Sequence, residues 1–190
     1  MIILASASPR RKELLEQLGC EFTIEVSAAE EVMAGAMTPA QMAEENARRK
    51  AMAVAAQHPQ SAVLGADTIV VLDGKVYGKP ADADEACAFL RRLSGQRHQV
   101  ITGIALCTDG QMLSRAVSTE VRFAELSEEE IRAYVATGEP LDKAGAYAIQ
   151  GRAAAFIEGI DGSFSNVVGL PLRAVVELAK EAGVTLYAGA

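Results

Sequence analysis

The sequence has little cysteine and histidine: of its 190 residues three are cysteine, two are histidine, and none is tryptophan. Cys20, Cys87 and Cys107 lie far apart and never form a Cys-x-x-Cys pair, so neither a disulfide framework nor a zinc site is expected. His58 and His98 have no ligand residues near them in the sequence and are interpreted as structural or surface residues. This cysteine usage fits a reducing cytoplasm, where we expect the protein to reside.

Long apolar runs and the common nucleotide-binding motifs are also missing. No apolar stretch is long enough to span a membrane, so no membrane partner is expected. The strand-like start at residues 1–5 lacks the pattern of a signal peptide. Neither Gly-x-Gly-x-x-Gly nor Gly-x-x-x-x-Gly-Lys-Ser/Thr occurs, which argues against a Rossmann dinucleotide site and a P-loop. The net charge of −7 repels nucleic-acid backbones, so no polynucleotide partner is expected.

Half of the residues are hydrophobic, which predicts a globular protein, here one domain over residues 1–190. Strand and helix patterns alternate along the chain, as in an α/β protein. Strands are expected at 1–6, 21–26, 62–72, just after 73–74, 99–107, 111–123, 154–158 and 184–187. Helices are expected from residue 8 and at 38–57, 82–93, 127–136 and 170–181. Asp-Gly turns at 73–74 and 109–110 predict two hairpins and therefore a mixed sheet.

Asp67 interrupts an otherwise apolar strand at residues 62–72. Burying a carboxylate costs several kcal/mol unless it is paired or bound to a metal, so this acid needs a reason to be there. Two interpretations are open. The acid caps a turn or pairs with a buried base, or it is a catalytic acid or metal ligand at the end of a strand, pointing into a cleft.

Residues 6–12, Ser-Ala-Ser-Pro-Arg-Arg-Lys, join the first strand to the first helix. A helix N-terminus attracts phosphate, and cations in its first turn oppose the helix dipole unless an anion accompanies them. The three cations at 10–12 therefore favour an anion site. The alternative is a solvated basic turn that pairs with Glu13 and Glu16.

Four other segments carry polar residues that could have a functional role or could simply be exposed to solvent. Glu31 lies in a loop where paired acids are usually just solvated, although metal binding is open. Lys50 lies in a charged helix, and spacing alone favours an exposed position. Lys79 is held between glycine and proline and can reach a phosphate as a point charge. In the glycine-bounded segment 142–151, Gln150 can both donate to and accept from a base edge.

No single segment is decisive, but their combination is. Ser-x-Ser-Pro-Arg-Arg, Gly-Ala-Asp-Thr, Gly-Lys-Pro and Asp-Lys-Ala-Gly-Ala-Tyr-x-Ile-Gln-Gly occur in this order between Ile3 and Leu186. The chain closely resembles the Maf family, the septum-formation-inhibitor-like nucleotide pyrophosphatases. Its version of the segment from Tyr147 to Gln150 resembles the branch that acts on dTTP and UTP, and not the branch that acts on 7-methyl-GTP.

The resemblance implies an elongated mixed sheet flanked by helices, with two lobes around a cleft, similar to the inosine triphosphate pyrophosphatases. The implied reaction cuts the α–β phosphoanhydride bond of a nucleoside triphosphate and gives the monophosphate and pyrophosphate. It requires a divalent cation, Mg²⁺ or Mn²⁺. Removal of non-standard pyrimidine nucleotides is a possible role, and a homodimer is the family expectation.

The resemblance also implies roles for single residues. Asp67 corresponds to the family's proton acceptor, and Asp67 and Glu31 are the expected metal ligands. Expected catalytic residues are Asp67, Lys79 and Lys50. Expected substrate-binding residues are Ser8, Arg10, Arg11, Thr68, Lys143 and Gln150, among which Arg10, Thr68 and Gln150 correspond to positions tied to base selection. The residues at 27–29 lack an additional acid that some family members have there.

Two other functions are considered. A non-catalytic nucleotide-binding regulator of septum formation and cell division would share the fold, but retention of Asp67, Lys79 and the full segment around Gln150 favours an enzyme. Inosine triphosphate pyrophosphatase chemistry is the third possibility, and Gln150 fits a pyrimidine better.

Overall fold

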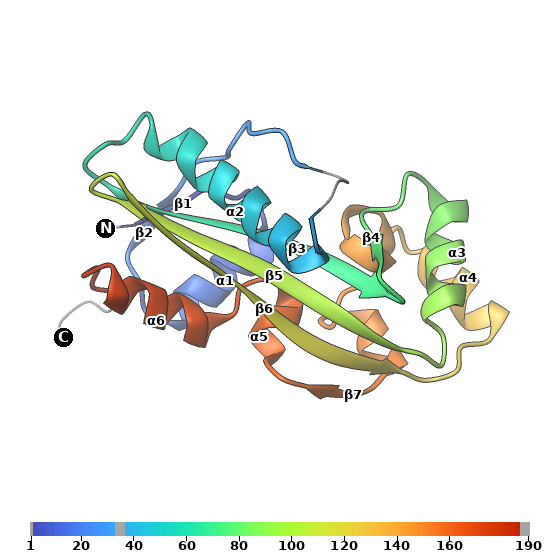
Figure 1. Cartoon of the computed structure of the whole chain (residues 1–190). Coiled ribbons are helices and arrows are strands. Elements are labelled where there is room, and N and C mark those ends of the chain that lie inside the picture. The colour runs from blue at the N-terminus through green and yellow to red at the C-terminus, as the bar shows by residue number, and fades with distance from the viewer. Residues whose placement is uncertain (1, 33–36, 187–190) are drawn as a thin grey trace. The chain divides into compact units, whose positions relative to one another are not determined.

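The computed structural model describes residues 2–32 and 37–186, and it contains one mixed sheet of seven strands (Figure 1). The strand order is β2-β1-β3-β5-β6-β7, and β4 pairs with β3. The strands are β1 Ile2–Leu4, β2 Phe22–Ile24, β3 Ala62–Leu72, β4 Lys75–Tyr77, β5 Arg97–Thr108, β6 Gln111–Phe123 and β7 Ile157–Asp161. The helices are α1 Pro9–Gln17, α2 Pro39–Ala55, α3 Ala83–Leu93, α4 Glu128–Val135, α5 Phe164–Val168 and α6 Leu172–Glu181. The α/β class and the mixed sheet expected from the sequence are confirmed.

The chain divides into two compact units. The first comprises residues 1–67, 102–117 and 169–190, and the second comprises residues 68–101 and 118–168. The long strands β3, β5 and β6 contribute residues to both. None of the helices in the described residues combines the length and apolar character needed to cross a bilayer.

In the first unit, β1 lies between β2 and β3 and is parallel to both. Helix α2 lies along the sheet over β3 and β5 (Figure 1). Glycine makes this contact very close: a Cβ atom on Gly65 would lie 2.2 Å from the carbonyl oxygen of Ala47, and one on Gly103 would lie 2.2 Å from that of Ala43. One buried cluster of this unit consists of small and β-branched residues, namely Ile3, Ala5, Ala47, Ala51, Val54, Val63 and Ala105. Side chains on the face of α2 that is turned to the sheet therefore reach the part of β3 that carries Asp67.

Helix starts follow the local signals in the sequence. Ser8 caps α1 by accepting a hydrogen bond from the backbone N–H of Arg11, with proline in the first turn. Thr38 and Ser127 form capping boxes with Gln41 and Glu130 at the starts of α2 and α4. Each such cap typically stabilises its helix by ~1 kcal/mol.

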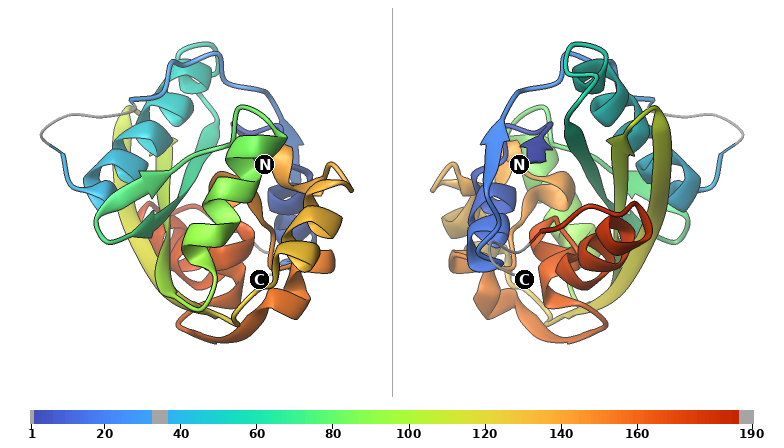
Figure 2. Two further views of the ribbon diagram at one scale, coloured as in Figure 1. Left: turned by 90° about the vertical axis from the view of Figure 1, so that its right-hand side faces the viewer. Right: turned by 90° about the vertical axis from the view of Figure 1, so that its left-hand side faces the viewer.

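In the second unit, α3, α4, the sheet and the 3₁₀ turns contribute to one hydrophobic cluster. Helices α3 and α4 lie side by side (Figure 2). His98 is buried among aromatic rings, and its Nε2 lies 2.7 Å from the hydroxyl of Tyr147. The hairpin of β3 and β4 turns at Asp73 and Gly74, both with positive φ, as the Asp-Gly signal predicts.

The sequence-based elements differ from the structure in three places. Residues Arg152–Phe156 form a 3₁₀ helix, and the strand expected at 154–158 begins only at Ile157, where pairing with β6 starts. Residues 184–186 form no strand; the N–H of Val184 donates to the carbonyl of Ala179 and closes the end of α6. The remaining residue of that expected strand, 187, lies outside the described residues. Helix α5 occupies a stretch expected to be a loop.

The three cysteines are free, as expected from their spacing.

Candidate functional site

Asp67 is buried on β3 beneath helix α2, with 7% of its surface exposed. Lys50 Nζ lies 2.6 Å from Asp67 Oδ1, and Asn46 Nδ2 donates to Asp67 Oδ2 at 3.2 Å. Residues 46 and 50 are one turn apart, so both side chains leave the helix on the same face. The close approach of α2 at Gly65 brings that face to the strand. Each carboxylate oxygen of Asp67 therefore has its own partner from α2.

Glu31 brings a second carboxylate to the same cation. Its Oε1 lies 2.6 Å from Lys50 Nζ, so one ammonium is shared by two acids. The side chains of Lys50 and Asp67 are 15% and 9% exposed, whereas that of Glu31 is 48% exposed. The exposed position that helix spacing alone favoured for Lys50 is wrong, because its face of α2 is turned toward the sheet.

Arg11 points inward from the first turn of α1. Its Nη1 donates to Ser6 Oγ at 2.9 Å and its Nε donates to the carbonyl of Gly169 at 2.8 Å. Burial lowers the pKa of Arg11 below its usual value, while the carboxylates of Asp67 and Glu31 act in the opposite direction. The guanidinium stays charged, since its usual pKa is very high. Arg11 thus adds a second cation to the neighbourhood of the two acids.

The other residues at the start of α1 behave differently. Lys12 pairs with Glu16 at 3.5 Å on the surface, as the solvated-turn interpretation expects. Arg10 is half-buried and has no ion pair among the residues that the structure describes. Ser8 uses its side-chain oxygen for the helix cap, and its N–H donates to Ser6 Oγ at 3.3 Å. Arg10 is therefore the cation of this helix end for which the described residues provide no acid, whereas Arg11 points toward Asp67 and Glu31.

In the second unit, two lysine-bearing segments are joined by their backbones. The N–H of Gly145 donates to the carbonyl of Gly78 at 3.0 Å, which brings the segments of Lys79 and Lys143 together. Lys143 Nζ donates to the carbonyl of Glu139 at 2.6 Å, and Lys79 is exposed. Gly145 has a φ of 68°, and a Cβ there would lie 2.7 Å from Val70 Cγ2, so this turn requires glycine.

Gln150 and Thr68, the two further predicted substrate-binding residues, also belong to the second unit. Gln150 is half-buried and precedes Gly151, whose φ is 89°. Glu139 lies against Gly151, and Tyr134 donates to Glu139 Oε1 at 3.1 Å, which holds this turn. Thr68 follows Asp67 on β3, so its side chain faces the opposite side of the sheet.

Two residues of the site were given no role of their own from the sequence, although Ser6 belongs to the segment 6–12 singled out there. Asn46 binds Asp67, and Ser6 binds Arg11. A signal for Asn46 was available: it is an amide on the alanine-bearing face of a helix, four residues before Lys50, where an apolar residue is the usual choice.

The donor set suits a hard divalent cation that is shared with a phosphate ligand. Asp67 and Glu31 already converge on one positive charge, the ammonium of Lys50. Among residues 2–32 and 37–186, no group of three or more histidine, cysteine or acidic side chains could hold a metal ion. Mg²⁺ usually takes one or two carboxylates and completes its shell with phosphate and water, which fits two acids.

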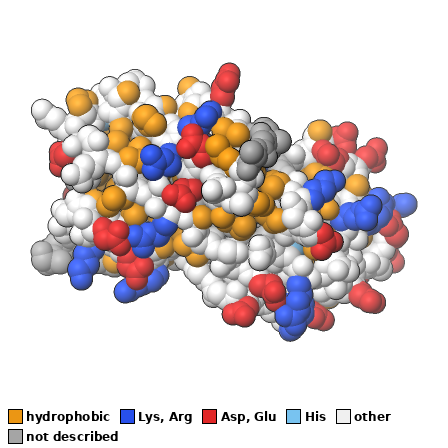
Figure 3. Space-filling model, viewed as in Figure 1, with side chains coloured by type: hydrophobic (Ala, Val, Ile, Leu, Met, Phe, Trp, Pro, Cys, Tyr) orange, Lys and Arg blue, Asp and Glu red, His pale blue; other side chains and the backbone are white. Residues whose placement is uncertain are grey.

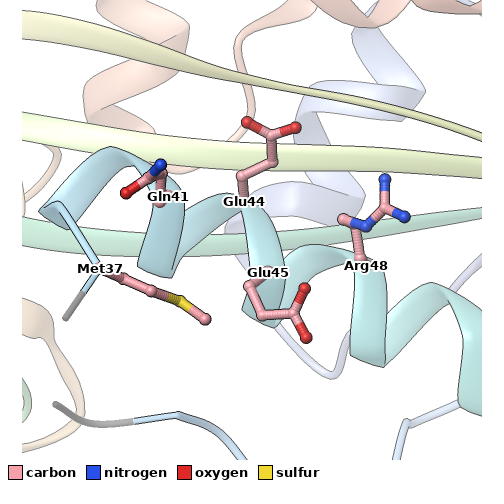
Figure 4. Close-up of a pocket in the computed structure, with 5 residues that line it drawn as sticks. All are labelled: Met37, Gln41, Glu44, Glu45 and Arg48. Carbon is pink, nitrogen blue, oxygen red and sulfur yellow. The ribbon is translucent and has the colours of Figure 1, made fainter. Parts of the chain in front are cut away.

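A separate pocket lies beside α2, and its lining residues include none of the predicted site residues (Figure 4). It is lined by Met37, Gln41, Glu44, Glu45 and Arg48. Ser114 donates to Glu44 Oε1 at 2.6 Å and accepts from Arg48 Nη1 at 3.0 Å, so Glu44 and Arg48 are bound to the same hydroxyl. Acidic and basic side chains are interspersed on the molecular face shown in Figure 3.

Comparison with known proteins places the chain in a family. The family model described as Maf-like protein matches residues 1–182. A protein of Symbiobacterium thermophilum named dTTP/UTP pyrophosphatase is 53% identical over 188 residues, which cover 99% of this chain and 97% of the relative. One of Pelotomaculum thermopropionicum with the same name is 52% identical, with 96% of each chain covered.

One solved structure has a fold similar to that of this chain. The Staphylococcus aureus Ham1 protein matches with a TM-score of 0.54 at 15% identity, covering 96% of this chain and 98% of its own. At this identity the likeness concerns the fold alone, and it agrees with the mixed α/β architecture. The match of the family model over residues 1–182 and the two relatives at 52–53% identity show that the chain belongs to the Maf-like protein family.

Proposed function

We propose that this protein is a nucleoside triphosphate pyrophosphatase that hydrolyses dTTP and UTP to the monophosphate and pyrophosphate. Relatives about 50% identical over nearly the whole chain are named for this activity. The observation that carries the proposal is the buried carboxylate of Asp67, which is held by Lys50 and Asn46 beside a second acid and Arg11. An acid that is buried, oriented and surrounded by cations is suited to chemistry on an anionic substrate.

Asp67 acts as the proton acceptor for the attacking water. Its two oxygens are oriented by separate partners, so the carboxylate cannot rotate freely. A base within hydrogen-bonding reach of the water contributes ~10²–10⁴-fold to the rate. Arg10 and Arg11 at the start of α1 bind phosphate oxygens, because the helix N-terminus and two cations favour an anion there.

Asp67 and Glu31 would hold Mg²⁺ or Mn²⁺. When bound, the cation supplies positive charge to the phosphate oxygens and lowers the cost of charge development at the leaving pyrophosphate. Lys50 then provides a further positive charge beside both carboxylates. The homodimer and the cytoplasmic location that the resemblance implies stay predictions.

Most of the remaining recognition residues belong to the second unit, and Arg10 belongs to the first. Lys79 and Lys143 are point charges for phosphate, and Gln150 reads the edge of the pyrimidine, with Thr68 and Arg10 assisting in base selection. A primary amide complements the carbonyl acceptor and N–H donor that uracil and thymine present side by side. The thymine methyl group needs only space, so dTTP and UTP are both substrates, as are modified pyrimidine nucleotides of similar shape.

The direct test measures pyrophosphate release by the purified protein from dTTP, UTP, CTP, ATP, GTP and 7-methyl-GTP. We expect the largest kcat/KM for dTTP and UTP, with one pyrophosphate per monophosphate. Binding of dTTP without turnover in the presence of Mg²⁺ would instead support the non-catalytic regulator. A preference for 7-methyl-GTP would overturn the proposed base selection.

A further inference from the structure

Asn46 is a buried amide in the middle of α2, with 3% of its surface exposed and the fully buried Ala43 and Ala47 beside it. Burying an amide without hydrogen-bonding partners is unfavourable, so the partners of Asn46 explain why it is there. Nδ2 donates to Asp67 Oδ2 and to the carbonyl of Val32, both at 3.2 Å. Oδ1 accepts from the N–H of Val32 at 2.7 Å. All three bonds go to residues outside the helix.

These bonds connect the two segments that carry the acids of the site. Asp67 lies on β3, and Val32 directly follows Glu31. Because Asn46 binds both the N–H and the carbonyl of Val32, it holds that residue's backbone as a neighbouring strand would. Glu31 then lies where its carboxylate meets Lys50.

The amide has only one workable orientation. Both hydrogens of Nδ2 point at acceptors, and the oxygen faces a donor. A flipped amide would place Oδ1 against the carboxylate of Asp67 and the carbonyl of Val32, which is repulsive. Aspartate at this position has no hydrogen to donate to Asp67, and leucine can fill the volume but binds nothing.

We propose that Asn46 is a positioning residue for the hydrolysis described above. It orients the carboxylate of Asp67 and holds the segment of Glu31, so that both acids face the same cation. This inference rests on the proposed function. Asn46 itself contacts no substrate, so its removal lowers turnover and leaves nucleotide binding nearly intact.

The test compares the parent with Asn46→Leu and Asn46→Asp. Loss of a residue that orients a metal or catalytic ligand typically lowers activity by about 10–100-fold, and we expect this loss in kcat for dTTP. KM for dTTP should stay within about threefold of the parent, since no nucleotide contact is removed. Asn46→Asp should lose more than Asn46→Leu, because it sets a third carboxylate against Asp67.

A second readout does not depend on activity. In the parent, the N–H of Val32 is protected from hydrogen exchange by Asn46 Oδ1. Asn46→Leu should raise its exchange rate by about tenfold or more, while amides in the core of β3 change little. Asn46→Asp keeps an oxygen that can accept from this N–H, so it should leave the exchange rate of Val32 closer to that of the parent. Unchanged exchange at Val32 in Asn46→Leu would overturn the link between Asn46 and the segment of Glu31.

Asn166→Leu is the matched control. Asn166 is also fully buried, and its Nδ2 donates to the carbonyl of Val100 at 2.9 Å and to Thr119 Oγ1 at 3.0 Å, all within the second unit. The same chemical change there should lower the melting temperature but keep kcat within a few-fold. An equal loss of kcat in both leucine variants would show a general effect of destabilisation and would overturn the inference.

Two outcomes separate the inference from the function on which it rests. An inactive parent refutes the proposed function, whereas the exchange rate of Val32 still tests the positioning contact. If the parent is active and both the Asn46→Leu and the Asn46→Asp variant keep the parent's kcat, the role of Asn46 is refuted while the proposed function stands. If Asn46→Leu does not fold, Asn46→Asp, which keeps the size of the side chain, decides.

Discussion

Lys50 Nζ lies 2.6 Å from Asp67 Oδ1 and also 2.6 Å from Glu31 Oε1, so two acids from separate segments share one ammonium. The side chain of Asp67 is buried, whereas that of Glu31 is half-exposed to solvent. A shielded carboxylate depends strongly on its cation, whereas an open one is hydrated and depends on it less. Lys50 therefore contributes both to the stability of the fold and to the arrangement of the two acids of the site.

Lys50→Met should destabilise the protein through Asp67. Removing one partner of a buried pair typically costs ~3–5 kcal/mol, and the half-exposed Glu31 should keep the loss near the lower end. The double variant Lys50→Met/Asp67→Asn should recover much of the loss, because no buried carboxylate remains. The measurement is urea unfolding.

Lys12→Met is the control for this experiment. Its pair with Glu16 is exposed on both sides, so its loss should change stability by less than about 1 kcal/mol. Equal effects of the two substitutions would contradict the special position of Lys50.

Asp67→Asn should leave the fold intact and remove most turnover. The amide keeps the size of the side chain and can still accept from Asn46, but it has neither a base nor a negative charge. We expect kcat for dTTP to fall by about 10²–10⁴-fold. The melting temperature is measured alongside, and a variant with kcat within a few-fold of the parent would show that Asp67 is structural.

Activity should require Mg²⁺ or Mn²⁺. The two candidate ligands, Asp67 and Glu31, have hard oxygen donors, which suit these ions. Excess EDTA should abolish pyrophosphate release and added Mg²⁺ should restore it. Glu31→Gln should raise the Mg²⁺ concentration needed for half-maximal rate. Full activity in EDTA would refute the metal requirement.

Gln150→Ala should weaken base selection. Loss of one hydrogen-bonding partner leaves a polar edge of the base unsatisfied, at ~1–3 kcal/mol. kcat/KM should therefore fall more for dTTP and UTP than for a poor substrate such as ATP. Gln111→Ala, at an exposed position on β6, is the control. If the Gln150→Ala variant keeps the parent's ranking of substrates, Gln150 does not read the base.

His98 should make stability depend on pH below neutrality. Burial lowers its pKa from 6.5 to about 4, so between these values the unfolded chain binds a proton that the folded chain does not. Stability is therefore full above pH 6.5 and falls as the pH drops toward 4, by about 3 kcal/mol in total. Denaturant titrations at several pH values measure this slope.

His98→Gln separates the histidine from other titrating groups. Glutamine cannot titrate but can still bond the hydroxyl of Tyr147. The variant should lose most of the slope between pH 6.5 and 4. A variant that keeps the parent's slope would assign the dependence to other residues.

Local signals in the sequence were sufficient for most helix starts and for the hairpins. Ser8, Thr38 and Ser127 each bond a backbone N–H three residues ahead, so the information lies within one turn of chain. The positive φ of Asp73 and Gly74 is likewise a property of the two residues themselves.

The errors concern elements that need a distant partner. Residues 154–158 have a strand-like composition, but pairing with β6 begins only at Ile157. Residues 184–186, Val-Thr-Leu, also have residue types that occur in strands, but they form no strand in the described part of the chain. A strand exists only when a neighbour accepts its hydrogen bonds, and composition does not say which neighbour is free.

The candidate site shows the same division. A single acid in the apolar strand 62–72 was enough to mark Asp67, because burial of a charge demands a partner wherever the strand lies. The contact of α2 with β3 decided which residues meet Asp67. The helix lies so close to Gly65 that no side chain would fit at that position. That contact turned Lys50 inward and made a partner of Asn46, which the sequence alone left unnoticed. Local hydrogen bonds are encoded by neighbours in the chain, whereas the meeting of two carboxylates at one cation depends on packing between segments far apart in it.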